Sequence, residues 1–204
     1  MYYIVVDGNI GSGKSTLIKN LKNIFKADNI IICEEDINSW INSGWLEKYY
    51  ENDRYSFGFQ MKVTLSHFKQ IKEIKENHKN LDNKIIITER SAFTSLHIFS
   101  KLLERTGKLD PLEVKLHQEY FDFMGCKPDL IICLDTTPEN AFKRIIQRER
   151  SGEASISLDY IRKLDKEYKN LNENSYNVKT IYIDANNTQE KVTKFCKDII
   201  LNSS

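Results

Sequence analysis

The chain has 204 residues, which is enough for one α/β domain with a sizeable core, and we expect residues 1–204 to form a single domain. Its 30 Lys and Arg residues balance 29 Asp and Glu residues, so no overall positive charge favours binding to a nucleic-acid polymer. No apolar run reaches the length of a membrane span, and the cysteines show no C-x-x-C spacing. We therefore expect a soluble, cytoplasmic protein with buried, reduced thiols and with no membrane contact, disulfide or zinc site.

The first apolar run, residues 2–6, leads into a glycine-rich loop that opens a helical pattern. The loop has the spacing G-x-x-x-x-G-K-[ST] and consists of Gly8, Asn9, Ile10, Gly11, Ser12, Gly13, Lys14, Ser15 and Thr16. In such a P-loop, backbone N–H groups surround a phosphate at the N-terminus of a helix. Lys14 is expected to reach the β- and γ-phosphates of ATP, and Ser15 to bind Mg²⁺. The alternative interpretation is a glycine-rich turn without a ligand.

Five runs rich in Ile and Val predict the strands, and they cover residues 2–6, 30–33, 84–88, 130–134 and 179–183. Longer helical patterns separate these runs. This alternation is typical of an α/β fold with a five-stranded parallel sheet flanked by helices. Ligands bind such sheets at the C-terminal ends of the strands, so the residues that follow each run are the candidate site residues.

Carboxylates follow the second and third runs. Glu34 and Glu35 come after the second run, and Glu89 comes after the third. A glutamate at the end of one of these strands, taken alone, could have only a structural role, such as capping a helix. Beside a P-loop, however, the pair suits phosphoryl transfer, which needs one carboxylate near the acceptor hydroxyl and another near the metal.

Other polar residues at the strand ends favour helix starts. Asp36 and Ser91 are candidates for helix caps. Asp135 follows the fourth run and competes with Glu89 for the metal. The next residues, Thr137 and Pro138, predict an N-cap and the first residue of a helix, so we give Asp135 less weight.

The helix that begins at Pro138 carries arginines toward its end. Arg144, Arg148 and Arg150 leave the helix and enter a break at residues 151–152, and a new helical pattern begins near Leu158. One interpretation is a solvated basic face. The other interpretation is a lid over about residues 144–156, because a guanidinium group binds two phosphate oxygens at once and neutralises their charge.

Taken together, these motifs resemble the deoxyribonucleoside kinases, the family of the cellular deoxycytidine, deoxyguanosine and mitochondrial thymidine kinases. The resemblance runs nearly end to end, through the P-loop, the acid before Trp40, residues 54–60, the triplet Glu89-Arg90-Ser91, the arginines and residues 153–160. It implies a P-loop kinase fold with an arginine-bearing lid. It also implies that ATP, with Mg²⁺, phosphorylates the 5′-hydroxyl of a deoxyribonucleoside for nucleotide salvage.

The resemblance further implies roles for single residues. Glu35 is expected to be the general base on the 5′-hydroxyl, with Glu34 as the alternative because the family has proline where Asp36 stands. Glu89 is expected beside the metal, and Arg90 between the 5′-oxygen and the γ-phosphate. The lid residues expected to act on the transferred phosphoryl group are Arg144, Arg148 and Arg150.

Contacts to the nucleoside follow from the same resemblance, and the expected residues are Trp40, Tyr49, Phe59, Gln60, Arg90, Ser95, Phe99 and Glu153. Gln60 is expected to read the base, because an amide has both donor and acceptor groups for a pyrimidine edge. The aromatic residues are expected to wall the base, with ordinary core packing as the alternative. Tyr49 and Glu153 are expected to hold the 3′-hydroxyl, and Tyr50 is an alternative to Tyr49.

Two positions depart from the family pattern. Members that prefer cytidine or purines place an arginine and an aspartate against the base, where this chain has His67 and Ser95. Ser95 leaves room for the methyl group of thymine, whereas His67 fits neither pattern and leaves the preference open. We expect the pyrimidine nucleosides thymidine and deoxycytidine as substrates.

Two competing functions are a nucleoside monophosphate kinase, such as thymidylate kinase, and a module that only binds a nucleotide. Glu35 would repel a charged monophosphate but suits an uncharged hydroxyl. A binding module would leave Gln60 and the lid arginines without a purpose. The resemblance also implies a homodimer, for which the sequence offers apolar residues on candidate helices, namely Phe68, Leu102, Leu103 and Phe121.

Overall fold

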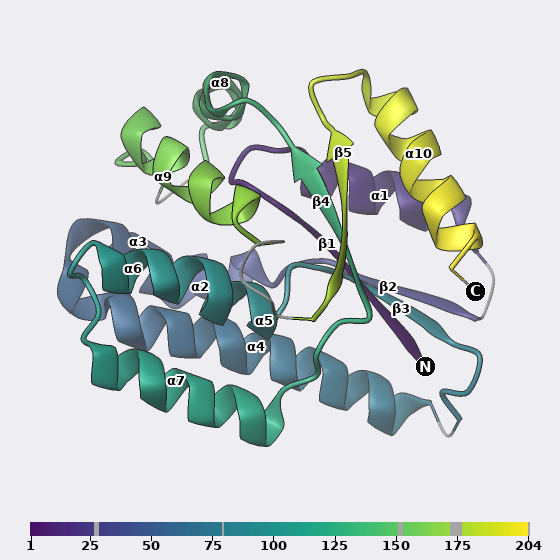
Figure 1. Cartoon of the computed structure of the whole chain (residues 1–204), viewed down its shortest axis with the longest axis horizontal. Helices are drawn as coiled ribbons and strands as arrows, with labels where there is room; N and C mark the ends of the chain where they lie inside the picture. The colour runs from purple at the N-terminus through teal and green to yellow at the C-terminus, as the bar shows by residue number, and fades with distance from the viewer. Residues whose placement is uncertain (27–28, 79, 151–152, 172–176, 204) are drawn as a thin grey trace.

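The fold is built on five parallel strands. The computed structural model describes residues 1–26, 29–78, 80–150, 153–171 and 177–203, and its strands form a sheet in the order β2-β3-β1-β4-β5 (Figure 1). The strands are β1 (Tyr2–Gly8), β2 (Ile30–Cys33), β3 (Ile85–Glu89), β4 (Leu130–Asp135) and β5 (Lys179–Asp184). Neighbouring strands are parallel throughout, which confirms the expected parallel sheet.

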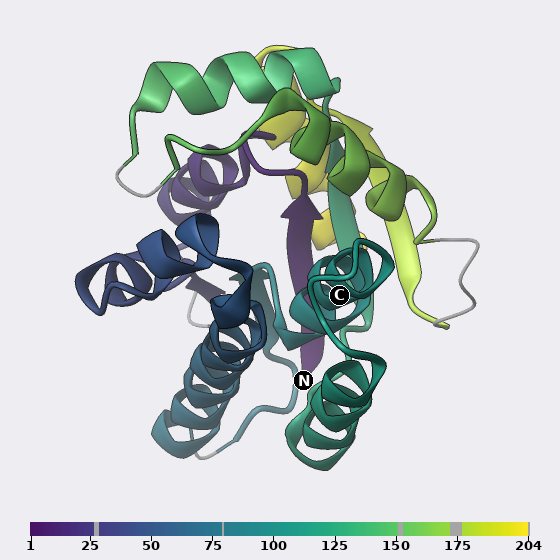
Figure 2. The same ribbon diagram turned by 90° about the vertical axis from the view of Figure 1, so that its left-hand side faces the viewer.

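Helices connect the strands and cover both faces of the sheet (Figure 1). Those in the described residues are α1 (Lys14–Ile24), α2 (Ile37–Asn42), α3 (Trp45–Glu51), the short η1 (Asp53–Tyr55), α4 (Ser56–Asn77), α5 (Ala92–Thr94), η2 (Ser95–Ser100), α6 (Lys101–Arg105), α7 (Pro111–Met124), α8 (Pro138–Arg148), α9 (Leu158–Lys169) and α10 (Gln189–Leu201). Figure 2 shows α1, α2, α3 and α8 gathered around the end of the molecule toward which β1 runs.

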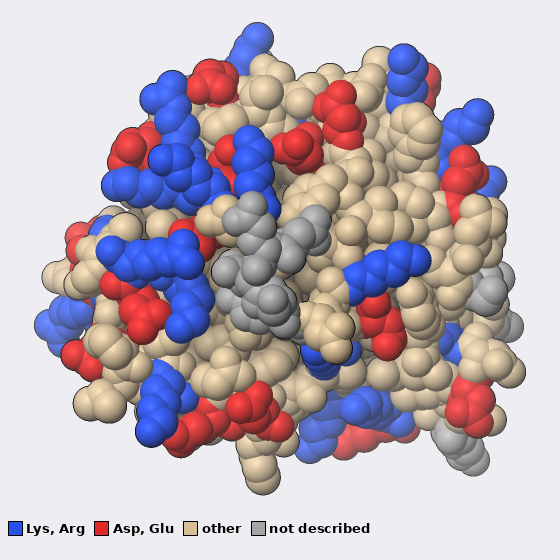
Figure 3. Space-filling view, in the orientation of Figure 1, with Lys and Arg blue, Asp and Glu red and all other residues tan. Residues whose placement is uncertain are grey.

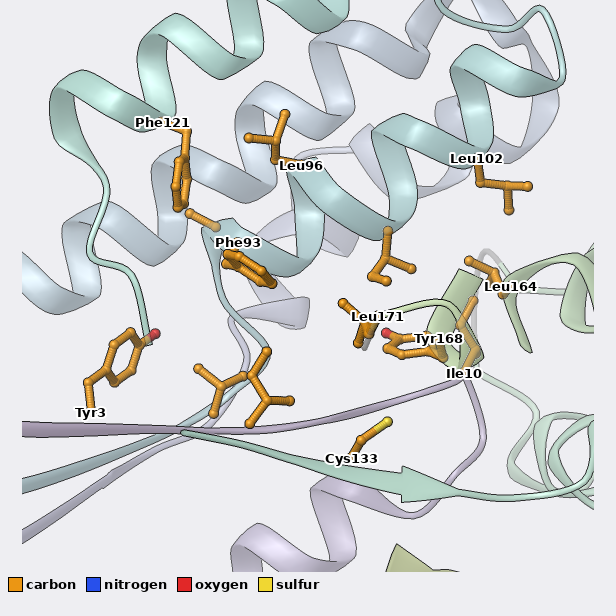
Figure 4. Packing of buried hydrophobic residues seen from close by; sticks show 14 of the residues in the cluster. Tyr3, Ile10, Phe93, Leu96, Leu102, Phe121, Cys133, Leu164, Tyr168 and Leu171 are labelled. Carbon is orange, nitrogen blue, oxygen red and sulfur yellow. The ribbon is translucent and has the colours of Figure 1, made fainter. Parts of the chain in front are cut away.

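Each face of the sheet has its own hydrophobic core, because successive side chains of a strand point to opposite faces. Tyr3 and Val5 of β1 pack with residues of α4, α7 and α9, and Figure 4 shows part of this cluster. Ile4 and Val6 pack with residues of α1 and α10 on the other face. Since both faces are covered, the strands are continuous runs of apolar residues.

The C-terminal edge of the sheet brings together the loops that follow β1, β2 and β3. Val6 of β1 pairs with Glu89 of β3, and Cys33 of β2 pairs with Thr88. The P-loop and the segments that carry the two candidate carboxylates therefore begin side by side at this edge, where ligands bind parallel sheets.

Helix boundaries follow from local capping. The Ser91 side chain accepts a hydrogen bond from the backbone N–H of Thr94, which confirms its expected role as a cap. Thr137 caps α8, with Pro138 at the first position, as predicted. Asp36 precedes α2, but within the described residues its side chain makes no capping hydrogen bond, so that expectation is wrong.

α8 and α9 are separate helices, as predicted, but α8 ends before Arg150. α8 ends at Arg148, and the next residue, Glu149, has a left-handed backbone with φ of 45°. α9 begins at Leu158, where Ser157 accepts a capping hydrogen bond. Residues 151–152, where we expected the break, lie outside the described part of the chain.

The π-helix η2 was not predicted from the sequence. It joins α5 to α6 and places Ser95 and Phe99 at the site described below. A π-turn inserts an extra residue into the helical repeat and is frequent at functional sites. Hydrophobic periodicity does not reveal it, because the apolar pattern of residues 92–103 also fits an ordinary helix.

The apolar residues that we expected at a subunit interface are in the core instead. All four are buried within this chain, namely Phe68, Leu102, Leu103 and Phe121. Helix α7 has apolar residues on two sides, and its sequence does not say which side faces the sheet. The large apolar side chains that α7 exposes are Leu112, Leu116, Tyr120, Phe123 and Met124.

Surface charges are mixed in sign. In Figure 3, basic side chains gather over α8 and α9, with acidic side chains among them. Arg162 pairs with Glu139 at 2.9 Å, and Lys163 pairs with Asp159 at 2.8 Å. Such exposed pairs contribute little to stability, but their acidic partners offset the positive charge of this face.

The cysteines are free thiols, of which two are buried and two are half-buried: Cys133 and Cys196, and Cys33 and Cys126. The expectation of buried thiols therefore holds for the first pair only. Within the described residues, helices that combine the length and apolar character needed to cross a membrane are absent.

Candidate active site

A cavity of about 580 Å³ lies at the C-terminal edge of the sheet. It brings together nearly all of the predicted site residues: Ile10, Gly11, Ser12, Gly13, Lys14, Ser15, Thr16, Glu35, Trp40, Tyr49, Phe59, Gln60, Glu89, Arg90, Ser95, Phe99, Arg144, Arg148, Arg150 and Glu153. Of the predicted residues, Gly8 and Asn9 do not line the cavity. Residues after β5 also line the cavity and were not predicted from the sequence: Ala185, Asn187 and Gln189.

The P-loop wraps around the Lys14 side chain. The Lys14 ammonium donates hydrogen bonds to the backbone carbonyls of Gly8 at 2.9 Å and Asn9 at 2.7 Å. Burial, and then the charge of Arg90, lower the pKa of Lys14 to about 7. Gly11 has φ of 79°, and a Cβ there would lie 2.3 Å from the backbone oxygen of Ala141, so the loop can pass under α8 only with glycine at this position.

Ser15 and Glu89, the two residues that we expect to bind the metal, are in contact. The Ser15 hydroxyl donates a hydrogen bond of 2.7 Å to Glu89 Oε1, across 74 positions of the sequence. Burial, and then the charge of Glu35, raise the pKa of Glu89 above its ordinary value. A hydroxyl and a carboxylate beside a phosphate loop are hard oxygen ligands of the kind that Mg²⁺ binds, together with substrate phosphates and water. The donor set therefore fits the expected ion.

Glu35 and Arg90 form a buried ion pair at the cavity wall. Arg90 Nη1 lies 3.1 Å from each oxygen of Glu35, whose side chain is 2% exposed. Burial opposes the charge of Arg90, but the carboxylate of Glu35 and other acids raise its pKa well above the ordinary value. Glu34 lies outside the cavity and pairs with Lys22 at 2.7 Å. Position therefore favours Glu35 over its neighbour as the base.

The backbone of Arg90 is strained. Its φ of 56° lies in the left-handed region, which is uncommon for residues other than glycine. Two hydrogen bonds hold it there, from its N–H to the carbonyl of Val6 at 3.0 Å and to its own carbonyl from the Thr88 hydroxyl at 2.7 Å. Its guanidinium carbon lies 5.2 Å from the centre of the Phe99 ring. Such strain is common where a side chain must be aimed into a site.

The far end of the cavity is aromatic and uncharged. Phe59 lies between Tyr49, stacked at 4.6 Å, and Trp40, edge-on at 5.8 Å. Gln60 is buried, and its side-chain oxygen accepts a hydrogen bond of 2.8 Å from the Ser95 hydroxyl. These groups can enclose a flat ring and meet its hydrogen-bonding edge.

His67 lies at this end as a buried, uncharged group. It lines the cavity and is edge-on to Trp40 at 6.4 Å between ring centres. Burial, and then the charge of Arg90, lower the pKa of His67 to about 4. His67 therefore supplies no charge to the cavity at neutral pH.

The residues expected to hold the sugar are not paired with each other. The Tyr49 hydroxyl lies 2.9 Å from the hydroxyl of Tyr160, and Glu153 accepts from Arg148 at 2.8 Å and from Arg150 at 3.2 Å. The charge of Glu153 contributes, after burial and Tyr160, to a raised pKa of Tyr50. Tyr50, the alternative one residue along, lines the cavity as Tyr49 does.

The three arginines do not all have the same partners. Arg144 donates to the backbone carbonyl of Ser12 in the P-loop at 3.3 Å and to that of Ala185 at 3.1 Å. Arg148 and Arg150 bind Glu153, as described above. Asp135, the alternative metal ligand, is exposed and does not line the cavity.

Four residues make hydrogen bonds around the site but were given no role from the sequence, namely Asp7, Thr94, Tyr160 and Tyr168. Their hydrogen bonds join segments up to 161 positions apart. The only local signal was an acid inside an otherwise apolar strand, because a buried Asp must have partners. Which partners it has depends on the tertiary fold.

Comparisons with known proteins agree with this geometry. A family model described as deoxynucleoside kinase matches residues 4–202. A fowlpox virus protein named "probable deoxycytidine kinase" is 35% identical over 178 residues, which are 84% of this chain and 72% of the relative. Human deoxycytidine kinase is 28% identical over 187 residues, 79% of this chain and 71% of the relative.

A solved structure shows the same fold. It is a deoxyadenosine kinase from M. mycoides with dCMP and a flexible dCDP bound, and it matches with a TM-score of 0.80 at 23% identity, over 99% of this chain and 100% of that chain. The family match covers nearly every residue and supports the nucleoside kinase interpretation over the monophosphate kinase alternative. The chain therefore belongs to the deoxynucleoside kinase family and is a phosphotransferase that acts on the 5′-hydroxyl of nucleosides.

Proposed function

We propose that this kinase transfers the γ-phosphoryl group of ATP to the 5′-hydroxyl of pyrimidine deoxyribonucleosides, thymidine and deoxycytidine, to make their monophosphates for nucleotide salvage. The observation that carries the base preference is the hydrogen bond between Ser95 and Gln60 at an uncharged, aromatic end of the cavity. Purines would bury amino and ring-nitrogen groups there without a charged acceptor, because serine stands in place of an aspartate. An unpaired buried donor costs about 1–3 kcal/mol.

Glu35 is the proposed general base. Its carboxylate must take a proton from the 5′-hydroxyl as the oxygen attacks the γ-phosphorus. Arg90 Nη1 donates to both oxygens of Glu35 and so fixes the direction of the carboxylate. When the substrate binds, some N–H groups of Arg90 can donate to the attacking oxygen and the γ-phosphate, because a guanidinium has five N–H donors.

The donor side is proposed to hold ATP and Mg²⁺. Ser15 and Glu89 would bind the ion, which would neutralise phosphate charge and orient the γ-phosphoryl group. Lys14 would exchange its two loop carbonyls for β- and γ-phosphate oxygens. Arg144, already on the P-loop, and the lid arginines Arg148 and Arg150 would stabilise the charge of the transferred group. The proposed lid covers about residues 144–156.

Steady-state kinetics test this proposal. ADP release is measured with ATP and Mg²⁺ and with thymidine, deoxycytidine, deoxyguanosine, deoxyadenosine, uridine or cytidine as acceptor. We expect the two pyrimidine deoxyribonucleosides to have kcat/KM values roughly ten- to a hundredfold above the purines. A higher value for either purine would overturn the base preference, and His67 would then be the first residue to re-examine. Phosphorylation of thymidylate in place of thymidine would overturn the acceptor assignment.

We further propose that the kinase works in the cytoplasm as a homodimer. Free thiols suit a reducing compartment. The dimer surface would be the outer stripe of α7, which is made of the exposed apolar residues Leu112, Leu116, Tyr120 and Phe123. Their spacing of three or four positions places them on one side of the helix, and a contiguous apolar patch of this kind is typical of a protein interface.

A further inference from the structure

Asp7 is a buried carboxylate that the proposed chemistry does not use. It lies in β1 immediately before the P-loop and is 1% exposed. Its Oδ1 accepts hydrogen bonds from the backbone N–H of Gly8 at 2.8 Å and from the Tyr168 hydroxyl at 2.9 Å. Its Oδ2 accepts a short hydrogen bond from the Thr94 hydroxyl. Each donor comes from a different part of the chain.

These donors lie in segments that form the site or contact it. Gly8 is the first residue of the P-loop. Thr94 belongs to the turn that begins with Ser91, directly after Glu89 and Arg90, and the Thr94 and Ser91 hydroxyls lie 3.2 Å apart. Tyr168 belongs to α9, the helix that follows the proposed lid. Figure 4 shows its ring in the core cluster close to Ile10, a residue of the P-loop.

Helix α9 makes two more contacts of this kind. The Asn9 side chain of the P-loop donates a hydrogen bond of 2.8 Å to the backbone carbonyl of Ile161. At the start of the same helix, the Tyr160 hydroxyl meets that of Tyr49, which lines the nucleoside end of the cavity. One helix therefore touches the donor loop, the acceptor wall and the carboxylate between them.

We infer that Asp7 and Tyr168 are positioning residues that fix the distance between the phosphate donor and the nucleoside acceptor. The carboxylate ties the start of the P-loop to the turn after Arg90 and to α9, and Tyr160 at the start of α9 contacts Tyr49 of the acceptor wall. In-line phosphoryl transfer is sensitive to this distance, since a misplacement of about 1 Å can lower the rate about a hundredfold. The inference rests on the kinase activity but not on the proposed base preference.

The test compares two tyrosine hydroxyls that both bind within this region. Tyr168→Phe removes a donor to Asp7. Tyr182→Phe is the matched control, because the Tyr182 hydroxyl binds the backbone carbonyl of Tyr168 at 2.7 Å and so anchors α9 without touching Asp7. Both are measured with the best nucleoside of the wild-type enzyme, well below their melting temperatures. We expect kcat to fall by about tenfold or more in Tyr168→Phe and by less than about twofold in Tyr182→Phe.

A second donor separates positioning from loss of stability. Thr94→Val removes the other side-chain donor while keeping the shape of the side chain, so kcat should fall again while the KM of the nucleoside changes by less than about threefold. The double variant that combines Tyr168→Phe and Asp7→Asn should lower kcat by less than the product of the two separate factors, because both substitutions weaken the same hydrogen bond. Equal kcat values for Tyr168→Phe, Thr94→Val and Tyr182→Phe would overturn the inference. A wild-type enzyme that prefers purines would overturn the base preference alone.

Discussion

Glu34 and Glu35 are neighbours in the sequence with opposite surroundings, and this contrast gives a residue-scale prediction. Glu35→Gln should lower kcat by about a hundredfold or more and leave the dissociation constant of the nucleoside nearly unchanged, because the amide keeps the shape but accepts no proton. The measurement is single-turnover kinetics together with nucleoside titration.

Glu34→Gln is the matched control, since Glu34 lies on the surface and pairs with Lys22. Its kcat should stay within about twofold of the wild-type value. A large loss of kcat in Glu34→Gln, with little change in Glu35→Gln, would identify Glu34 as the base.

Lys14 gives a second prediction at this scale, on pH dependence. Its pKa of about 7 in the empty enzyme lies below its ordinary value, so at about pH 8 most molecules carry a neutral Lys14. Binding of the triphosphate should restore the charge, because the phosphates favour the ammonium form. ATP binding at about pH 8 should therefore take up close to one proton, and affinity should fall as the pH rises above about 7.

Calorimetry in buffers of different ionisation enthalpy measures this proton uptake. Lys14→Arg is the comparison, because arginine stays charged throughout this range. Uptake that is as large in Lys14→Arg as in the wild-type protein would assign the proton to another group.

At the scale of elements, α8 makes a prediction about the lid. Arg148→Ala and Arg150→Ala should each lower kcat by about tenfold or more and change nucleoside affinity less, because arginines stabilise charge that develops on the transferred group. The control is Arg162→Ala on α9, an exposed residue that pairs with Glu139 on the surface. A loss of nucleoside affinity with intact kcat would place the two arginines in the acceptor site.

The strands could be predicted from the sequence, whereas the contacts between elements could not. Buried runs of Ile and Val separated by helical patterns usually form a parallel sheet covered by helices. All five runs are strands within one or two residues of the expected bounds. The motif residues were also found, since a P-loop and a Glu-Arg-Ser triplet are local patterns. By contrast, Tyr49 meets Tyr160 across 111 positions, and no local pattern records that hydrogen bond.

At the scale of the whole molecule, the outer stripe of α7 predicts the oligomeric state. Phe123 is 88% exposed, and a charge placed on this apolar stripe should disrupt an apolar interface. Light scattering of the wild-type protein should give about twice the mass of the 23.9 kDa chain, and Phe123→Glu should shift it toward one chain. Phe195→Glu on α10, another exposed phenylalanine, should leave the mass unchanged. A monomeric wild-type protein would contradict the proposal.

Among the strands of the described residues, β2 is the shortest, lies at one edge of the sheet with β3 as its one neighbour, and is half-buried along its whole length. Elements with one neighbour and partly solvated hydrogen bonds are the first to open in partial unfolding. Because Glu35 follows this strand, the proposed base is attached to a short edge strand that has no fully buried residue. Mild denaturant should therefore inactivate the enzyme before circular dichroism reports any loss of helix, and amide exchange should be fastest in β2 among the strands.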